Sequence, residues 1–262
     1  MFNNKRVCIF VDGENLRHSI VELFPSFDKR TYLPRADWTR FFDWIASEVA
    51  GQDAYRVRSY WYVVQNIDFS PYNLSAARKN QRNLETILLR DSGIGGDLSR
   101  TVSQEERNKL IEKIADALEK TQRDMEKRFA GWTSLQDVIA HDHTAVEFRR
   151  AGAIRYDLFN MALGSEKAVD VKLATDLIKL KDIYDIAVIV SGDQDYVPAV
   201  DAIKDFGKHT VNVSFQTENG RLLPGGARRL NQSTDRILKV KHSVLQTYLN
   251  LKEVISETRE EA

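Results

Sequence analysis

Residues 186–190 read IAVIV and are followed directly by the polar segment SGDQD of residues 191–195. A short apolar run that stops abruptly in polar residues is typical of a parallel strand that is buried on both faces and ends in a loop. Residues 5–11 (KRVCIFV) repeat this pattern and end at Asp12 and Gly13. The sequence therefore predicts two strands of one parallel sheet, each followed by acidic residues.

Two helices are predicted around the later strand, because apolar residues recur there at helical spacing. They are Val171, Ala174, Leu177 and Ile178 before the strand, and Val197, Val200 and Ile203 after it, around Pro198 in a first helical turn. A third strand is predicted at residues 209–215 (HTVNVSF). Alternating strands and helices predict right-handed crossovers and an α/β fold with a mostly parallel sheet.

A further helix and a further strand are predicted between residues 37 and 64, and they complete the first half of the sheet. Residues 37–45 predict a helix capped by Asp37, and residues 55–64 alternate like a strand.

From about residue 68 to residue 151 the pattern changes to long polar helices, whose composition is that of helices facing water. They are expected at residues 72–89 and 104–129, separated by the glycine-rich residues 91–96. We interpret residues 68–151 as a helical insertion.

The expected organisation is one domain over residues 1–240 that contains this insertion, followed by a C-terminal helix and tail at residues 241–262. The apolar residues 244–251 favour a helix that docks on the domain, and they leave open pairing with a second subunit as a homodimer.

Composition excludes some classes of protein. Lys plus Arg equals Asp plus Glu at 38 each, so net charge gives no argument for nucleic acid binding. Cys8 lies inside an apolar run, which favours a small core residue over a reactive or metal-binding thiol. The amino terminus has no signal peptide pattern and no run reaches the roughly 20 apolar residues of a membrane span, so a cytoplasmic protein is expected.

The acidic residues after the strands are the candidate site. Asp12 follows the first strand, and Asp193 and Asp195 follow the later one. Neighbouring parallel strands end at one edge of a sheet, so these side chains are expected to converge there. Crowded carboxylates repel one another unless a cation neutralises them, and Mg²⁺ or Mn²⁺ prefers such oxygen ligands.

Each acid also has an ordinary structural interpretation, and these stay open. Asp12 is a common turn residue before glycine, and Asp193 and Asp195 suit a loop and a helix cap. Asp170, at the start of the predicted helix, suits a cap or a helix-dipole partner, whereas Asp176 suits a solvated or ion-paired role.

Three segments together carry a family resemblance. Residues 10–15 (FVDGEN), 167–176 (KAVDVKLATD) and 190–196 (VSGDQDY) resemble the motif blocks of NYN domains, the LabA-like branch of the PIN-like nucleases. The resemblance covers residues 5–65 and 150–215. It implies a three-layer α/β/α PIN-like (Rossmann-like) fold and metal-dependent ribonuclease activity with Mg²⁺ or Mn²⁺.

The resemblance also implies roles for single residues. Asp12, Asp170, Asp193 and Asp195 resemble the catalytic, metal-binding acids, while Asn15, Ser191 and Asp176 are expected to support them without being the main ligands. Such a site would hydrolyse a phosphodiester through a metal-activated water.

An RNA substrate, single-stranded or structured, needs basic residues around these acidic residues, because the phosphate backbone is itself negative. The candidates are Arg149, Arg150, Arg155, Lys167, Lys172, Arg221, Arg228 and Arg229. Each of them is equally an ordinary surface charge. Tyr60, Trp61 and Tyr62 offer stacking surfaces for bases or belong to the core, and zinc binding at residues 141–143 lacks evident partner ligands.

Two other functions remain as alternatives. A haloacid-dehalogenase-like phosphatase shares the sheet and Mg²⁺ but needs a second aspartate two residues after the first, where this chain has Glu14. A non-catalytic RNA-binding or regulatory protein with a PIN-like fold is the other. The sequence does not distinguish RNA from DNA, endonuclease from exonuclease, or one metal ion from two.

Overall fold

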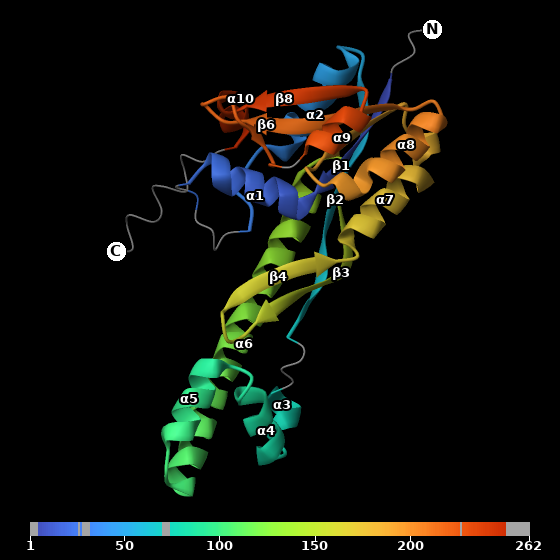
Figure 1. The fold of residues 1–262 in the computed structure, drawn as a ribbon. Coiled ribbons are helices and arrows are strands. Elements are labelled where there is room, and N and C mark those ends of the chain that lie inside the picture. The colour runs from blue at the N-terminus through green and yellow to red at the C-terminus, as the bar shows by residue number, and fades with distance from the viewer. Residues whose placement is uncertain (1–4, 26, 28–31, 70–73, 226, 250–262) are drawn as a thin grey trace. The chain divides into compact units, whose positions relative to one another are not determined.

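The computed structural model describes residues 5–25, 27, 32–69, 74–225 and 227–249. It divides into two compact units. The first comprises Met1–Val63, Trp132–Ala151 and Ala168–Ala262, and the second comprises Val64–Gly131 and Gly152–Lys167. Figure 1 labels most of the helices and strands of both units.

The first unit is built on a sheet whose strands run in the order β3-β2-β1-β5-β6. The strands are β1 (Arg6–Asp12), β2 (Tyr55–Asp68), β3 (Val146–Asp157), β5 (Ile186–Val190) and β6 (His209–Gln216), with β7 (Leu222–Leu223) and β8 (Arg236–Lys241) beyond them. β1 pairs in parallel with β2 and β5, and β6 pairs in parallel with β5 and β8. The predicted mostly parallel sheet is confirmed.

Helices cover both faces of this sheet. They are α1 (Gly13–Leu23), α2 (Trp38–Ala50), α7 (Val169–Lys179), α8 (Val197–Asp205), α9 (Arg228–Ser233) and α10 (His242–Tyr248). On β2, the Trp61 ring packs edge-on against Trp38 of α2 with centroids 4.8 Å apart, while the next residue, Tyr62, bonds to Asp176 of α7. Successive strand side chains point to opposite faces, so α2 and α7 lie on opposite sides and the three layers are confirmed.

The described part of the C-terminal segment docks on the domain. Helix α10 contacts α2 and β8, and the Tyr248 ring lies 5.7 Å from Phe41 and 5.9 Å from Trp44. Residues 250–262, which complete the predicted helix and tail, lie outside the described residues.

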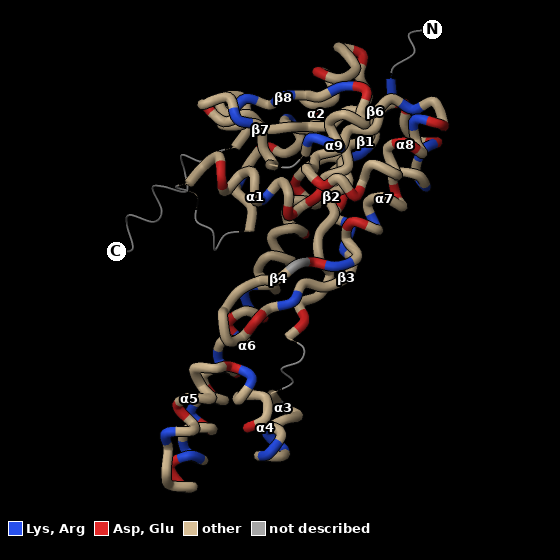
Figure 2. The backbone as a smooth tube through the Cα atoms, in the orientation of Figure 1, with Lys and Arg blue, Asp and Glu red and all other residues tan. Residues whose placement is uncertain are grey.

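The second unit contains α3 (Leu74–Ala77), α4 (Gln81–Leu88), α5 (Ser92–Arg100), most of α6 (Gln104–Asp142) and a hairpin of β4 (Ala162–Lys167) with the end of β3. Buried residues follow a helical stripe along α6 at Ile111, Ala115, Leu118 and Met125. Figure 2 shows charges of both signs along these helices, as expected for faces that meet water.

Two predictions for the helical region are wrong. Residues 91–96 are not a separator, because α5 begins at Ser92, where the Asp91 carboxylate caps the helix by accepting from the Ile94 N–H at 2.9 Å. The predicted helix at residues 72–89 is also not continuous, because Asn80 caps a new helix, α4. Residues 72 and 73 lie outside the described residues.

Two further properties follow from the elements. Among the described residues, none of the helices combines the length and the apolar character needed to cross a bilayer. Cys8 is fully buried in β1, and this burial raises the pKa of its thiol to about 12, in agreement with its predicted core role.

Gly13, where the chain leaves β1 for α1, tests this packing. A Cβ on Gly13 would lie 2.5 Å from the Tyr62 carbonyl oxygen and 2.9 Å from Val63 Cγ1, so Gly13→Ala is expected to destabilise the fold by about 1 to 3 kcal/mol. The matched control is Gly131→Ala on an exposed position of α6, where a Cβ meets nothing within 4 Å and helix propensity favours alanine by up to about 1 kcal/mol. Urea unfolding of both variants measures the difference, and equal midpoints would contradict the close approach.

Candidate active site

The candidate site lies where β1 and β5 end. Val11 is paired with Val190 in the parallel register of these strands, so Asp12 and Ser191 leave the sheet side by side. The central strands therefore bring together acids that are about 180 residues apart in sequence.

Asp12 is fully buried and accepts hydrogen bonds from three residues. Its Oδ1 accepts from the Asn15 N–H at 3.1 Å, which caps α1. Its Oδ2 accepts from Asn15 Nδ2 at 2.6 Å, Ser191 Oγ at 2.9 Å and the Tyr196 hydroxyl at 3.2 Å. Asp12 is therefore a helix cap and the acceptor that joins α1 to the loop after β5.

Burial has a cost for this carboxylate. Desolvation raises the pKa of Asp12 to about 6, with a smaller contribution from the nearby Asp170 carboxylate, while the bonds from Asn15, Ser191 and Tyr196 oppose the shift. None of these three donors carries a charge, so nothing in this set neutralises an ionised Asp12.

Asp170 lies in the first turn of α7 and is half-buried. Its Oδ1 accepts from the same Tyr196 hydroxyl at 2.8 Å. Burial raises the pKa of Asp170, and the carboxylates of Asp193 and Asp195 add to the shift. Asp170 is not a helix cap, because the capping position is Ala168, which makes no side-chain bond to the helix.

The loop after β5 carries the other two acids. Asp193 caps the short 3₁₀ helix η2 (Gln194–Tyr196) by accepting from the Asp195 N–H at 2.9 Å, and its own N–H donates to Ser191 Oγ at 3.0 Å. Asp195 is exposed. Asn15 also accepts from the Gly192 N–H at 3.2 Å, so its amide connects α1 to this loop.

Asp176 belongs to a separate ionic cluster. It is fully buried and accepts from Tyr62 at 3.1 Å, Lys172 at 3.2 Å and the Arg149 guanidinium, which lies 4.0 Å over the Tyr60 ring. Burial alone would raise the pKa of Asp176, but the bonds and charges of Arg149 and Lys172 hold it below its usual value. Asp176 therefore fastens α7 to β2 and β3.

The predicted basic residues occupy several different environments. Arg149 and Lys172 bind Asp176, Arg150 binds Gln136 and Asp137 of α6, and Arg221 pairs with Glu22. Arg155 and Lys167 belong to the second unit, and Arg228 and Arg229 are exposed on α9. Their role in RNA binding stays a prediction, and the first four would have to exchange an internal bond for a phosphate.

Other candidate residues have structural roles. Tyr60, Trp61 and Tyr62 are all buried, so they are core residues and not stacking surfaces. His143 Nδ1 lies 3.3 Å from Thr39 Oγ1, while His141 is exposed beside Asp142. This arrangement brings no set of zinc ligands together.

The donor chemistry of the acids suits a hard cation, because every candidate ligand is a carboxylate oxygen. Within the described ranges, however, no group of three or more His, Cys, Asp or Glu side chains is arranged as a ligand set. The Tyr196 hydroxyl bonds both Asp12 and Asp170, whereas Asp193 is half-buried and caps η2, and Asp195 is exposed. The side chains fit Mg²⁺ or Mn²⁺ in kind, and Asp195 is the most exposed of the four acids.

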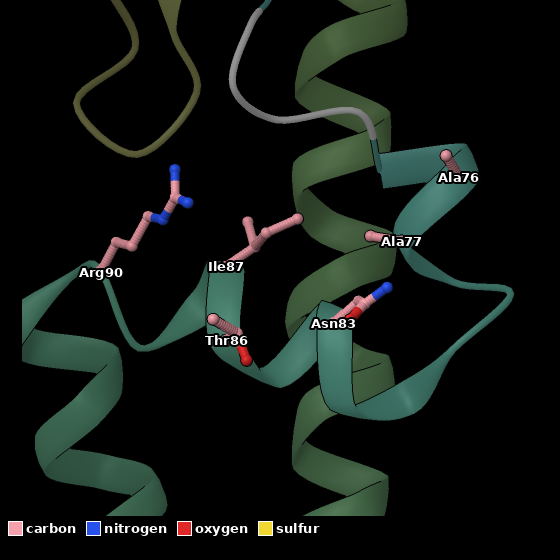
Figure 3. A pocket seen from close by; sticks show the side chains of 6 residues that line it. All are labelled: Ala76, Ala77, Asn83, Thr86, Ile87 and Arg90. Carbon is pink, nitrogen blue, oxygen red and sulfur yellow. The ribbon is translucent and has the colours of Figure 1, made fainter.

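A groove opens directly beside these acids. It has a volume of about 420 Å³, and its lining includes Asp170, Asp195 and the apolar side chains of Val171, Ala174, Ile178 and Pro198. It lies between α7 and α8, which pack against each other. A different pocket, in the second unit, is lined by Ala76, Ala77, Asn83, Thr86, Ile87 and Arg90 (Figure 3), a set without carboxylates.

A family model for the NYN domain matches residues 97–224, which include Asp170, Asp193 and Asp195. This match assigns residues 97–224, just under half of the chain, to the NYN domain. NYN domains are generally nucleases of the PIN-like class, so the predicted family is confirmed, while the LabA-like branch stays a prediction.

Other comparisons add little. No curated protein matches the chain. A solved structure of a protein of unknown function from Vibrio parahaemolyticus is 16% identical, with a TM-score of 0.43, and the match covers 92% of this chain and 95% of that chain.

Two site residues were not predicted from the sequence. Tyr196 stands inside a motif block, but nothing in the pattern showed that its hydroxyl turns towards the acids. Asn212 of β6 donates to the Ser191 carbonyl oxygen at 3.1 Å and to Asn231 Oδ1 at 2.7 Å. The alternation of Thr210, Asn212 and Ser214 in an otherwise apolar strand was the available signal.

Removing the charge of Asp176 tests its structural role. Asp176→Asn leaves Arg149 without its buried partner and is expected to lower the free energy of unfolding by about 3 kcal/mol at pH 7. Because the folded-state pKa is lowered, this stability is present above about pH 4 and is lost as the pH falls through the folded-state value. Urea unfolding at pH 7 and pH 3 should show a difference that narrows at pH 3.

The matched control is Asp182→Asn, because the ion pair of Asp182 with Lys181 is exposed, and little change is expected at either pH. A deficit in Asp176→Asn that is the same at both pH values would show that its cause is packing and not charge.

Proposed function

We propose that this NYN protein is a metal-dependent ribonuclease that hydrolyses RNA phosphodiester bonds at the acids beyond β1 and β5. The observation that carries the proposal is the meeting of Asp12 and Asp170 at one hydroxyl, beside Asp193 and Asp195, in a chain of a nuclease family. The mutual repulsion of these carboxylates is a cost that a bound cation would remove.

Asp170, Asp193 and Asp195 are the residues that would hold Mg²⁺ or Mn²⁺, with Asp12 behind them. When bound, such a cation activates the attacking water and neutralises charge that develops on the phosphate. Ser191 and Asn15 keep the loop in place by bonding Asp12 and the Asp193 and Gly192 backbones. The protein itself thus supplies orientation and negative charge.

The groove between α7 and α8 supports an approach of the substrate to these acids. Its apolar wall suits the face of a base or ribose, while Asp170 and Asp195 lie in the same lining. Helix α9 packs against η2, which carries Asp195, so the exposed Arg228 and Arg229 are on an element adjacent to the acids. These arginines are the proposed contacts to the phosphate backbone.

The phosphatase alternative requires an acid-base residue two positions after Asp12, and Glu14 at that position does not support it. Glu14, which would have to serve as acid and base, lies 3.5 Å from Arg17 and 3.7 Å from His18 of its own helix. The non-catalytic alternative has the same fold and differs from the nuclease proposal only in that the acids do not cleave RNA. A cleavage experiment therefore distinguishes the two.

Cleavage of labelled single-stranded and structured RNAs is expected with Mn²⁺ or Mg²⁺ and not with EDTA. Asp193→Asn should lower the rate by about 100-fold or more, because it removes a charged ligand without changing the size of the side chain. The matched control is Asp205→Asn, at the exposed end of α8, which should cleave like the wild type.

The outcomes separate the alternatives. RNA binding without metal-dependent cleavage, at equal strength in both variants, would replace the nuclease proposal with the regulatory one. Release of phosphate from small monoesters with RNA left intact would favour the phosphatase.

A further inference from the structure

The hydroxyl of Tyr196 occupies a specific place in the site. Tyr196 ends η2 and is fully buried, and its hydroxyl oxygen lies 3.2 Å from Asp12 Oδ2 and 2.8 Å from Asp170 Oδ1. The three residues come from η2, from the end of β1 and from the first turn of α7. One oxygen atom therefore connects three segments that are distant in sequence.

The hydroxyl carries a single hydrogen, so it donates to only one of two carboxylates at a time. Its position nevertheless keeps both acids within hydrogen-bond reach of the same atom. Without the hydroxyl, nothing in this contact would offset the repulsion between Asp12 and Asp170, and Asp170 would lose its hydrogen bond from Tyr196.

We propose that Tyr196 is a positioning residue that holds Asp170 in place for a divalent cation before the cation binds. The inference rests on the proposed function, since it concerns the same acids. Fixing a ligand in advance removes part of the ordering cost of binding, so cation affinity should depend on the hydroxyl.

The hydroxyl and the ring of Tyr196 have different contacts, so their roles can be tested separately. The ring is enclosed where η2 contacts α7, α8 and α9, and phenylalanine keeps that packing. Only the two contacts to Asp12 and Asp170 are lost in Tyr196→Phe. A change in cation binding in a stably folded variant is thus a readout that packing alone would not produce.

Tyr184→Phe is the matched control. Tyr184 is equally buried, but its hydroxyl donates to the Leu177 carbonyl oxygen at 2.5 Å and not to the acids. Each variant loses one buried hydroxyl and keeps its ring. Circular dichroism and urea unfolding in EDTA establish that both variants fold.

The experiment is titration of the full chain with Mn²⁺ alone. Binding is measured by calorimetry or from the electron paramagnetic resonance signal of free Mn²⁺. Tyr196→Phe should bind Mn²⁺ about tenfold more weakly than the wild type, whereas Tyr184→Phe should bind like the wild type. RNA cleavage by Tyr196→Phe should recover as the Mn²⁺ concentration is raised.

Equal or tighter Mn²⁺ binding by Tyr196→Phe would overturn the positioning role and leave the nuclease proposal intact, provided that the wild type cleaves RNA. Equal weakening in both tyrosine variants would also overturn it, because the effect would then follow from a lost buried hydroxyl in general. A wild type that neither binds Mn²⁺ nor cleaves RNA would refute the proposed function itself, and the inference with it.

Discussion

The buried carboxylate of Asp12 is the constraint on which the arrangement of the site depends. A carboxylate withdrawn from water is costly unless donors surround it, so every segment that reaches Asp12 has to present one. Helix α1 presents Asn15, the loop after β5 presents Ser191, and η2 presents Tyr196. The parallel register of β1 and β5 makes this possible, because both strands end at the same level of the sheet.

The two buried aspartates of the first unit, Asp12 and Asp176, differ in role because their surroundings differ. Asp176 lies against Arg149 and Lys172, which keep its pKa low and its charge balanced. Asp12 accepts only from neutral groups, so burial raises its pKa, and the nearby Asp170 carboxylate adds to the shift. The first arrangement is complete as it stands, whereas the second favours the arrival of a positive charge.

Much of the fold could be predicted because buried positions recur at the spacing of a strand or a helix and are occupied by apolar residues. The strand predicted at residues 186–190 coincides with β5, and Asp37 caps α2 as expected. The predicted elements omit α1, although Leu16, Ile20 and Leu23 have helical spacing. They also omit the hairpin of β3 and β4, because most residues of β3 are only half-buried and produce no apolar alternation.

The sequence by itself determined the parallel α/β sheet and the acids that follow its strands, since both are consequences of local apolar runs that end in polar residues. It could not determine what each acid contacts. Only the tertiary structure decided that Asp176 belongs to an ionic cluster with Arg149, and that Asp170 meets Asp12 through the Tyr196 hydroxyl. The physical reason is that a carboxylate's role depends on the donors and charges around it, and these come from segments that only folding brings together.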